Sequence, residues 1–301
     1  MSGKLYIVAT PIGNSGDMTD RARQILSESN IVAAEDTRVT QRLLNELGIK
    51  NKTVSNHKFN EKKQVDYLIS ELLLGNSIAV VSDAGTPCIS DPGHVIVKSA
   101  VENGVDVIAV CGASAVTSAL SVSGFDFVTF AFCGFFPRTA KEIKKLATQL
   151  NSESNNTFVF FESPMRIKKT VQLLAEELHD AEICLCNDLT KVYERIYRGF
   201  PDAVFKELSE NPSAEKGEYV MVLHIKSKPK LNSSENAVSL EAMLIDCAIK
   251  HSCTIKESVK LLTEKHKGKI TKNDFYAASV NLKEIVPGLF PYSRDSDIAI
   301  D

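Results

Sequence analysis

The sequence predicts an α/β protein of two domains followed by a small helical unit. Its 301 residues are enough for two domains and a short third. In the first domain, short apolar runs alternate with amphipathic stretches, which is typical of a mostly parallel sheet covered by helices. Later strands have short connections and indicate a mixed sheet. We expect domains at 1–125 and 126–226, a helix-turn-helix-like unit at 237–286 and a tail at 287–301.

The expected strands of the first domain are unbroken apolar runs, as in parallel strands covered on both faces. They are Leu5–Ala9, Ile31–Ala34, Ser77–Val81 and Val105–Val110. The segments between them carry apolar residues at helical spacing, and most end at a glycine, which closes a helix without steric cost. The expected helices are one capped by Thr19 with Ala22, Ile25 and Leu26 on its apolar face, then Thr40–Leu47, Glu61–Leu74, Val95–Asn103 and Ser114–Ser123.

The second domain has a looser pattern of the same kinds of element. Its expected strands are Phe130–Cys133, Thr157–Phe161, Glu182–Asp188, Arg195–Gly199 and Glu218–Ile225. Its expected helices are Ala140–Leu150, Arg166–His179 and Asp202–Leu208. The last three strands have short connections, so we expect them to pair antiparallel.

A linker, Lys226–Asn236, separates these domains from three short helices. Their starts carry capping residues: Ser239 before Leu240–Lys250, Thr254 with Glu257 as a capping box for a helix ending near Lys267-Gly268, and Thr271 with Asp274 for a helix carrying Phe275, Ala278 and Leu282. Three short helices with tight turns resemble a helix-turn-helix unit.

Charge is unevenly distributed along the chain. Residues 226–286 hold eleven Lys against seven Asp and Glu, whereas residues 1–225 hold 23 basic and 28 acidic residues. The basic C-terminal part suits a nucleic-acid contact, although a solvated lysine-rich surface gives the same composition.

Composition otherwise indicates a reduced, cytoplasmic protein. There is no apolar run near the ~18 residues that a membrane helix needs, and the polar start Met1–Lys4 is unlike a signal peptide. Seven cysteines without a CxxC pair favour free thiols over disulfides or zinc. Cys184 and Cys186, two apart on an expected strand, should face the same side. We expect no metal site.

The loop 82–93, Ser-Asp-Ala-Gly-Thr-Pro-Cys-Ile-Ser-Asp-Pro-Gly, follows a buried strand directly. Its residues offer backbone groups, hydroxyls and carboxylates with little bulk. Ligands bind at the carboxyl ends of strands in open α/β sheets, so the loop is a candidate binding loop. A structural strand-to-helix turn is the other interpretation.

Other strand ends carry similar segments. Ala9–Asn14 is neither GxGxxG nor a Walker loop, which excludes ordinary dinucleotide or nucleotide motifs. Ala33–Arg38 brings Glu35, Asp36 and Arg38 together, either as a catalytic and phosphate-binding group or as an internal ion pair with a helix cap. Cys111–Ala115 has small residues at the start of a helix, where N–H groups are free for a ligand.

Taken together, these segments resemble the bacterial small-subunit ribosomal RNA (cytidine-2′-O)-methyltransferase I family, in the tetrapyrrole-methylase-like superfamily. The matching segments are Leu5–Asn14, Ala33–Arg38, Val81–Pro87, Ile89–Gly93, Gly134–Arg138 and Leu189–Lys191. They occur in family order between residue 4 and about residue 225, and the C-terminal helical unit also has a counterpart there.

The resemblance implies two α/β domains of the tetrapyrrole methylase type, the class III S-adenosylmethionine methyltransferase fold. It implies S-adenosyl-L-methionine as cofactor, a homodimer, and 16S rRNA of the small ribosomal subunit as partner, methylated at the ribose 2′-oxygen of cytidine 1402. By matched position, the cofactor should contact Pro11, Asp83, Ala84, Gly85, Thr86, Ile89, Ser114 and Ala115. The ribose should lie near Glu35, Asp36, Arg38 and Lys191, with Asp36 as the first choice for the proton acceptor.

The chain departs from the family pattern at several positions. Met165 replaces a His, Asn187 and Asp188 replace an Arg-Glu pair, and Cys88 and Cys111 replace a Gly and a Pro. The changes near the strand expected to face RNA leave room for a diverged RNA target. Two other functions remain open from sequence: a small-molecule methyltransferase of the tetrapyrrole type, and a non-catalytic RNA-binding assembly factor.

Overall fold

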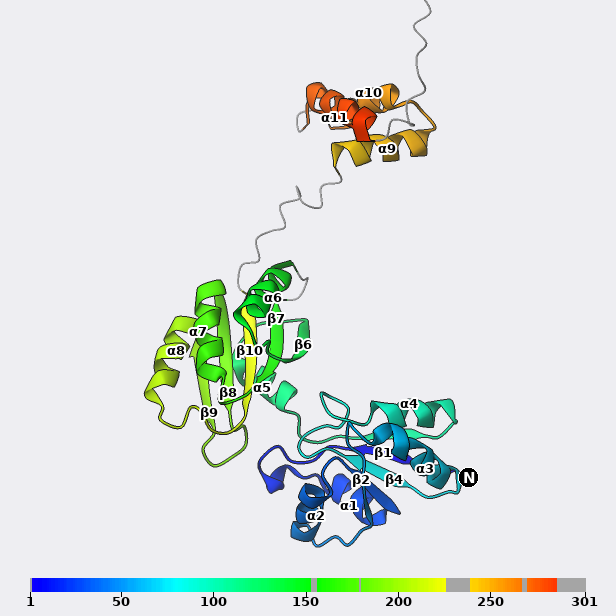
Figure 1. The fold of residues 1–301 in the computed structure, drawn as a ribbon, viewed down its shortest axis with the longest axis vertical. Helices are drawn as coiled ribbons and strands as arrows, with labels where there is room; N and C mark the ends of the chain where they lie inside the picture. Colours follow the sequence, from blue (N-terminus) through cyan, green and yellow to red (C-terminus); the bar gives the residue numbers. More distant parts are fainter. Residues whose placement is uncertain (1, 153–155, 179, 226–238, 267–269, 286–301) are drawn as a thin grey trace, which may run out of the picture. The chain divides into compact units, whose positions relative to one another are not determined.

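The computed structural model describes residues 2–152, 156–178, 180–225, 239–266 and 270–285 (Figure 1). The chain divides into two compact units, residues 1–228 and 229–301. The first unit contains two five-stranded sheets, and the second contains helices. The expected linker 226–236, the tail 287–301, His179 and the Lys267-Gly268 helix end lie outside the described residues.

The first sheet has the strand order β3-β2-β4-β1-β5. The sequence predicted a mostly parallel sheet, and all of its strand pairs are parallel. Its strands are β1 Leu5–Val8, β2 Ile31–Ala34, β3 Thr53–Ser55, β4 Ile78–Val81 and β5 Val107–Val110. Its helices are α1 Asp20–Glu28, α2 Thr37–Glu46, α3 Glu61–Leu73 and α4 His94–Glu102, with a 3₁₀ turn at Ser15–Asp17.

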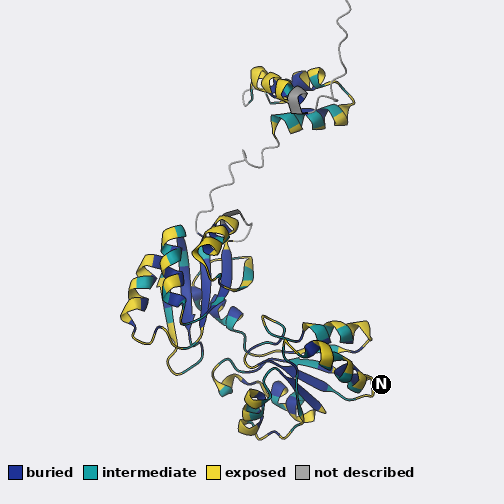
Figure 2. Cartoon of the chain, in the orientation of Figure 1, coloured by how far each residue is buried: buried dark blue, intermediate teal, exposed yellow. Residues whose placement is uncertain are grey.

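Burial on both faces explains the unbroken apolar runs. In β2, Ile31 and Ala33 pack in one core with residues of α3 and α4, whereas Val32 and Ala34 pack in another with residues of α1 and α2. Figure 2 shows the strands of this sheet mostly buried and the outer helix faces exposed. The sequence missed β3, because this three-residue edge strand is only half-buried and has no apolar run.

The second sheet has the order β6-β7-β10-β8-β9. Its strands are β6 Phe130–Phe135, β7 Thr157–Glu162, β8 Ala181–Asn187, β9 Arg195–Gly199 and β10 Tyr219–Ile225. Strand β6 pairs parallel with β7, and β10 and β9 pair antiparallel with β8, which confirms the antiparallel arrangement of the last three strands. The mixed sheet is the one that the sequence predicts.

Helices cover both faces of the second sheet. Ile183 and Leu185 face the core formed with α6 Ala140–Ser152, α7 Ile167–Glu177 and α8 Pro201–Glu210. Cys184 and Cys186 both face the opposite side of the sheet, which confirms that they share one face, and their sulfur atoms are 3.8 Å apart. That side is covered by α5 Ala115–Ser123, which follows the first sheet in sequence but packs on the second.

The second unit is a helical bundle of α9 Leu240–His251, α10 Ile255–Lys265 and α11 Lys272–Ile285. The predicted caps are confirmed, because Ser239 accepts from the Ala242 N–H, Thr254 and Glu257 form a capping box, and Thr271 and Asp274 bond reciprocally. The three helices meet around a core that includes Leu244, Leu262 and Phe275. No helix among the described residues is long and apolar enough to cross a membrane.

Candidate functional site

Two loops from neighbouring strands are joined at the carboxyl edge of the first sheet. The Thr10 N–H donates to the Gly85 carbonyl at 2.9 Å, and the Gly85 N–H donates back to Thr10 at 3.0 Å. The Thr10 hydroxyl also donates to the Ser82 carbonyl at 3.3 Å. These bonds bring the Ala9–Asn14 segment against the loop 82–93.

The loop 82–93 is shaped by left-handed backbone at four positions, Gly85, Cys88, Ser90 and Gly93. This conformation suits glycine, and a residue with a Cβ adopts it at a cost of roughly 1–2 kcal/mol. Cys88 has φ of 69°, which explains why a glycine suits this position in the family pattern. Strained residues of this kind gather at ligand sites, and the loop does adjoin a cavity.

A cavity of about 380 Å³ lies against this loop, and its lining comes from both sheets. The volume falls within the ~300–1,000 Å³ typical of small-molecule sites. Six of the eight expected cofactor residues line it: Ala84, Gly85, Thr86, Ile89, Ser114 and Ala115. Pro11 and Asp83 are outside the described lining, where Ile12 takes the place of Pro11.

The lining also holds residues that the site prediction missed. Ser90 and Asp91 belong to the Ile89–Gly93 segment, whose composition had signalled a binding loop. The rest come mainly from the second sheet and its connections: Val116, Phe135, Phe161, Glu162, Ser163, Pro164, Cys186, Leu189, Glu218, Tyr219 and Val220. Five of these eleven are apolar or aromatic strand residues, namely Phe135, Phe161, Cys186, Tyr219 and Val220, and the sequence gives no signal to separate them from ordinary core.

Glu162 at the end of β7 forms a buried ion pair beside this cavity. Its carboxylate accepts from the Arg166 guanidinium, from the Ser163 N–H at 2.6 Å and from the Thr170 hydroxyl at 2.7 Å. The Glu162 side chain has no exposed surface. Arg166 also donates to the Phe136 carbonyl, so this cluster holds the cavity wall in place.

Glu35, Asp36 and Asp83 meet where β2 and β4 end. The Asp36 N–H donates to Asp83 Oδ1 at 3.0 Å, and the Asp83 N–H donates to Glu35 Oε2 at 3.5 Å. Burial is the main cause that raises the pKa of Glu35, and repulsion from Asp83 and Asp36 adds to it. Burial likewise raises the pKa of Asp83. Glu35 is therefore a carboxylate with increased proton affinity.

Asp36 has a structural role that weakens the case for it as proton acceptor. It is the N-cap of α2, accepting from the Arg38 N–H at 2.8 Å, and its carboxylate pairs with the Arg38 side chain at 2.6 Å. The hydrogen bond from the Arg38 side chain lowers the pKa of Asp36 to about 2. Such a carboxylate holds a proton poorly at neutral pH, and Glu35 is the better candidate for this role.

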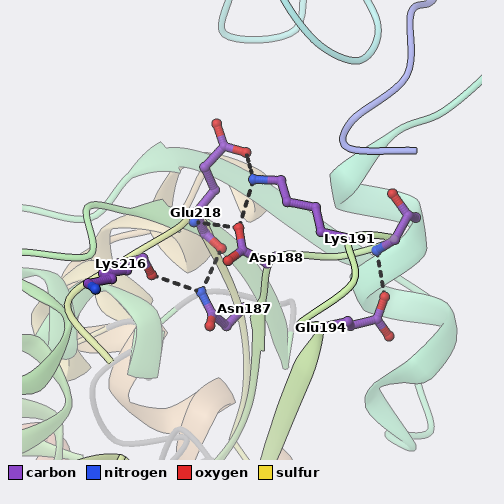
Figure 3. A network of polar contacts seen from close by, with 7 residues as sticks. Asn187, Asp188, Lys191, Glu194, Lys216 and Glu218 are labelled. Atoms are coloured by element: carbon purple, nitrogen blue, oxygen red, sulfur yellow. Dashed lines mark hydrogen bonds and ion pairs between the residues drawn. The ribbon is translucent and has the colours of Figure 1, made fainter. Parts of the chain in front are cut away.

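Lys191 lies in a different network, with its ammonium between two carboxylates (Figure 3). Its Nζ donates to Asp188 Oδ1 at 2.7 Å and to Glu218 Oε2 at 2.8 Å. Burial acts to lower the pKa of Lys191, but the bonds to Asp188 and Glu218 outweigh it, so the net shift is upward. Lys191 is therefore a cation, and a proton acceptor role does not suit it.

Two glycines make room for the Lys191 network. A Cβ on Gly217 would lie 2.1 Å from Asp188 Oδ2, and one on Gly13 would lie 2.4 Å from Lys191 Cγ. Gly13 thus lets Lys191 lie against the segment that follows β1. The contacts described for Lys191 do not include Glu35, Asp36 or Arg38. Of the four predicted ribose residues, Asp36 and Arg38 pair directly, and Glu35 joins them through Asp83.

The residues that depart from the family pattern differ in burial and in hydrogen bonding. Asn187 is buried and its amide donates to the Lys216 and Glu218 carbonyls at 3.2 and 3.4 Å, while Asp188 anchors Lys191 (Figure 3). Met165 is 72% exposed. Asn187 and Asp188 are therefore built into this network, whereas Met165 is free to meet a partner. Among the described residues, no group of three or more His, Cys, Asp or Glu is placed to hold a metal.

Comparison with known proteins identifies the family. The model of the Tetrapyrrole (Corrin/Porphyrin) Methylases matches residues 4–202. A curated relative from Halalkalibacterium halodurans, named ribosomal RNA small subunit methyltransferase I, is 41% identical over 73% of this chain and 75% of its own. The chain belongs to the ribosomal RNA small subunit methyltransferase I family of the tetrapyrrole methylases. This confirms the resemblance in the sequence.

Further comparisons agree with this family. The Vibrio cholerae protein of the same name is 38% identical over 90% of this chain and 92% of its own. Among solved structures, the methyltransferase CobJ has a TM-score of 0.54 at 14% identity, covering 75% of this chain and 95% of that one. The Thermus thermophilus uroporphyrin-III C-methyltransferase complexed with S-adenosylhomocysteine has a TM-score of 0.52 at 17% identity, covering 74% and 97%. These structures confirm that the first unit of this chain has the tetrapyrrole methylase fold.

Proposed function

We propose that this protein transfers a methyl group from S-adenosyl-L-methionine to 16S rRNA in the small ribosomal subunit, at the ribose 2′-oxygen of cytidine 1402. The observation that carries the proposal is the cavity in which six of the eight expected cofactor residues converge. The names of the relatives, which cover most of the chain, support ribosomal RNA as the substrate. The same names favour this function over the small-molecule methyltransferase and the non-catalytic assembly factor.

The lining of the cavity fits this cofactor. Small residues such as Ala84 and Gly85 let a flat ligand approach the backbone, and Thr86 and Ser114 add hydroxyl groups. The charged side chains of the described lining are carboxylates, which suit a cation. When bound, the cofactor supplies an electrophilic methyl group on a sulfonium.

The residues of this chain would position the acceptor and take up its proton. The ribose hydroxyl is a weak nucleophile, and a nearby carboxylate helps by accepting its proton as the new bond forms. Glu35 suits this role because its pKa is raised, whereas Asp36 fixes Arg38 through the ion pair. Arg38 in the first turn of α2 and Lys191 in the loop after β8 are cations that suit RNA phosphates.

We also propose that the enzyme is a cytoplasmic homodimer. Two large apolar side chains outside the cavity lining are exposed on β6 and just before it, at Phe130 and Val128. Because β6 is an edge strand, these residues offer a surface for a second copy of the chain.

The proposed activity is tested by methyl transfer from labelled cofactor to small ribosomal subunits of a strain that lacks the corresponding gene. We expect label at the ribose of a single cytidine, found by nuclease digestion and mass spectrometry. A porphyrinoid in place of the subunit should accept no label. Transfer to the porphyrinoid but not to the subunit would reject the proposal.

Filling the cavity should remove the cofactor. Ala84 is exposed and lines the cavity, so Ala84→Leu places a larger side chain where the ligand lies. Overpacking of this kind costs about 1–3 kcal/mol, so we expect about 10–100-fold weaker binding of S-adenosylmethionine by calorimetry. Ala277→Leu, at an exposed position of α11, is the matched control and should bind normally. Unchanged binding by folded Ala84→Leu would place the cofactor elsewhere.

The C-terminal unit should contribute electrostatic attraction to RNA. Lys256 and Lys260 are exposed one turn apart on α10, and we expect their double replacement by glutamine to weaken subunit binding. Each lost phosphate contact lowers the slope of log affinity against log salt by about 0.7–0.9. Lys141 and Lys145 on α6 have the same spacing and exposure, and their double replacement is the control. Equal slopes for the two variants would reject a specific role for the unit.

A further inference from the structure

The charged side chains of the described cavity lining are Asp91, Glu162 and Glu218, and all are carboxylates. Two of them already have a cationic partner from the protein. Glu162 pairs with Arg166 inside the second sheet, and Glu218 accepts from Lys191 at 2.8 Å. The charge of Glu162 is thus balanced by Arg166, whereas Glu218 shares the Lys191 cation with Asp188 and its side chain is 72% exposed to solvent.

The Asp91 carboxylate has no cationic partner among the described residues. Its hydrogen-bond partner is the Ser82 hydroxyl, and the charges that act on it are the carboxylates of Glu35 and Asp83. The thiol of Cys88 is also nearby on the same loop. Among the described residues, no lysine, arginine or histidine forms an ion pair with Asp91.

The surroundings of Asp91 make its negative charge costly. Burial is the largest cause, and repulsion from Glu35 and Asp83 adds to it, so the pKa of Asp91 is raised to about 6 despite the bond from Ser82. A carboxylate held in this way gains from a cation that enters the cavity, because an opposite charge within about 4–6 Å favours the ionised form.

We propose that Asp91 makes the cavity select the sulfonium form of the cofactor over its thioether product. The inference rests on the proposed function in one respect, namely that this cavity is the cofactor site. S-adenosylmethionine and S-adenosylhomocysteine share the adenosine, the ammonium and the carboxylate groups. They differ by the methyl group and by the positive charge on sulfur, so a lone carboxylate in the lining distinguishes them by charge.

This selectivity follows the course of the reaction. The bond between carbon and sulfur breaks while the bond between carbon and the ribose oxygen forms, sulfur keeps the electron pair, and the hydroxyl proton passes to the protein base. Asp91 therefore faces a cation before transfer and a neutral thioether afterwards. Because the charge on sulfur is already fading in the transition state, Asp91 acts on affinity and product exchange and does not accelerate transfer.

The test is calorimetric titration of the wild-type protein with each ligand between pH 5 and pH 8. At pH 8, S-adenosylmethionine should bind about tenfold or more tightly than S-adenosylhomocysteine, since a nearby opposite charge is worth about 1–3 pKa units. The preference should shrink as the pH falls through about 6, where Asp91 takes up a proton. Near pH 6, binding of S-adenosylmethionine should release a proton, seen with buffers of different ionisation enthalpy, and binding of the product should not.

Asp91→Asn should reduce the affinity ratio of the two ligands to near one at every pH. Asp106→Asn, at an exposed position outside the described cavity lining, is the matched control and should keep the wild-type ratio. A wild-type ratio near one at pH 8, or equal losses for both ligands in Asp91→Asn, would overturn the proposal while leaving the cofactor site intact. If the wild-type protein binds neither ligand, the assignment of the cavity as the cofactor site is wrong, and the proposed selectivity is rejected with it. The wild-type pH profile decides the matter even if Asp91→Asn fails to fold.

Discussion

Replacing Glu35 with glutamine should lower the rate of methyl transfer to small ribosomal subunits by about 10²–10⁴-fold, the range typical of a lost general base. The amide keeps the size of the side chain and can still accept from the Asp83 N–H, but it cannot take a proton. Affinity for S-adenosylmethionine, measured by calorimetry, should stay within about twofold, because the group acts on the reacting hydroxyl.

Asp36→Asn is the comparison that decides between the two neighbouring carboxylates. Asparagine caps helices about as well as aspartate, so α2 should be preserved. The ion pair with Arg38 would be lost, but Arg38 is 88% exposed and such pairs contribute little. We therefore expect a smaller loss of activity than in Glu35→Gln. A larger loss in Asp36→Asn would return the proton acceptor role to Asp36.

The pH profile offers an independent check of Glu35. A proton acceptor works only when it is deprotonated, so the transfer rate should fall as the pH decreases through the pKa of Glu35, which burial raises above its ordinary value of 4.5. The residual rate of Glu35→Gln should lack this acid limb. An identical acid limb in both proteins would assign it to another group.

Replacing Glu162 with glutamine should have the largest effect on stability. Breaking a buried ion pair costs about 3–5 kcal/mol, because the remaining charge is left without a partner. Here the guanidinium of Arg166, whose side chain is 27% exposed, would lose its carboxylate. We expect Tm to fall by roughly 10 °C, given about 2–4 °C per kcal/mol for a domain of this size.

Glu177→Gln is the matched control for this experiment. Glu177 lies on α7 of the same domain and is 3.8 Å from Lys144, whose side chain is 72% exposed. A surface pair of this kind contributes about 0–1 kcal/mol. Thermal unfolding followed by circular dichroism should thus separate the two variants clearly. Similar Tm values for both would show that the buried pair is not what stabilises the second sheet.

The alternation of strands and helices in the first domain was readable from the sequence because its cause is local. A parallel strand covered on both faces, such as Ile31–Ala34, must be apolar at every position, and that leaves an unbroken run. The short edge strand β3 is half-buried and carries no such signal. Helix caps such as Thr254 with Glu257 were also readable, since both partners lie within one turn.

The candidate site could be predicted only in part from the sequence. Six of the eight expected cofactor residues line the cavity, because loops rich in Gly, Ser and Pro at strand ends are where ligands bind. The cavity wall formed by Phe161, Tyr219 and Val220 could not be predicted from the sequence. Strand residues that line a cavity have the same composition as those that fill a core. Asp91 lies in the matching segment Ile89–Gly93, but its neighbours in sequence do not reveal that the carboxylates of Glu35 and Asp83 act on it.

The sequence by itself determined most of the strands, where several helices begin, and that the loops after β1, β2 and β4 carry polar groups. Only the tertiary structure decided what each of those groups does. Asp36 binds a proton weakly because Arg38 pairs with it, and Glu35 and Asp91 bind one more strongly because burial and repulsion disfavour their charge. Lys191 stays charged because folding places Asp188 and Glu218 around it. The physical reason is that charge is stabilised or opposed through space, by residues that can lie far apart along the chain.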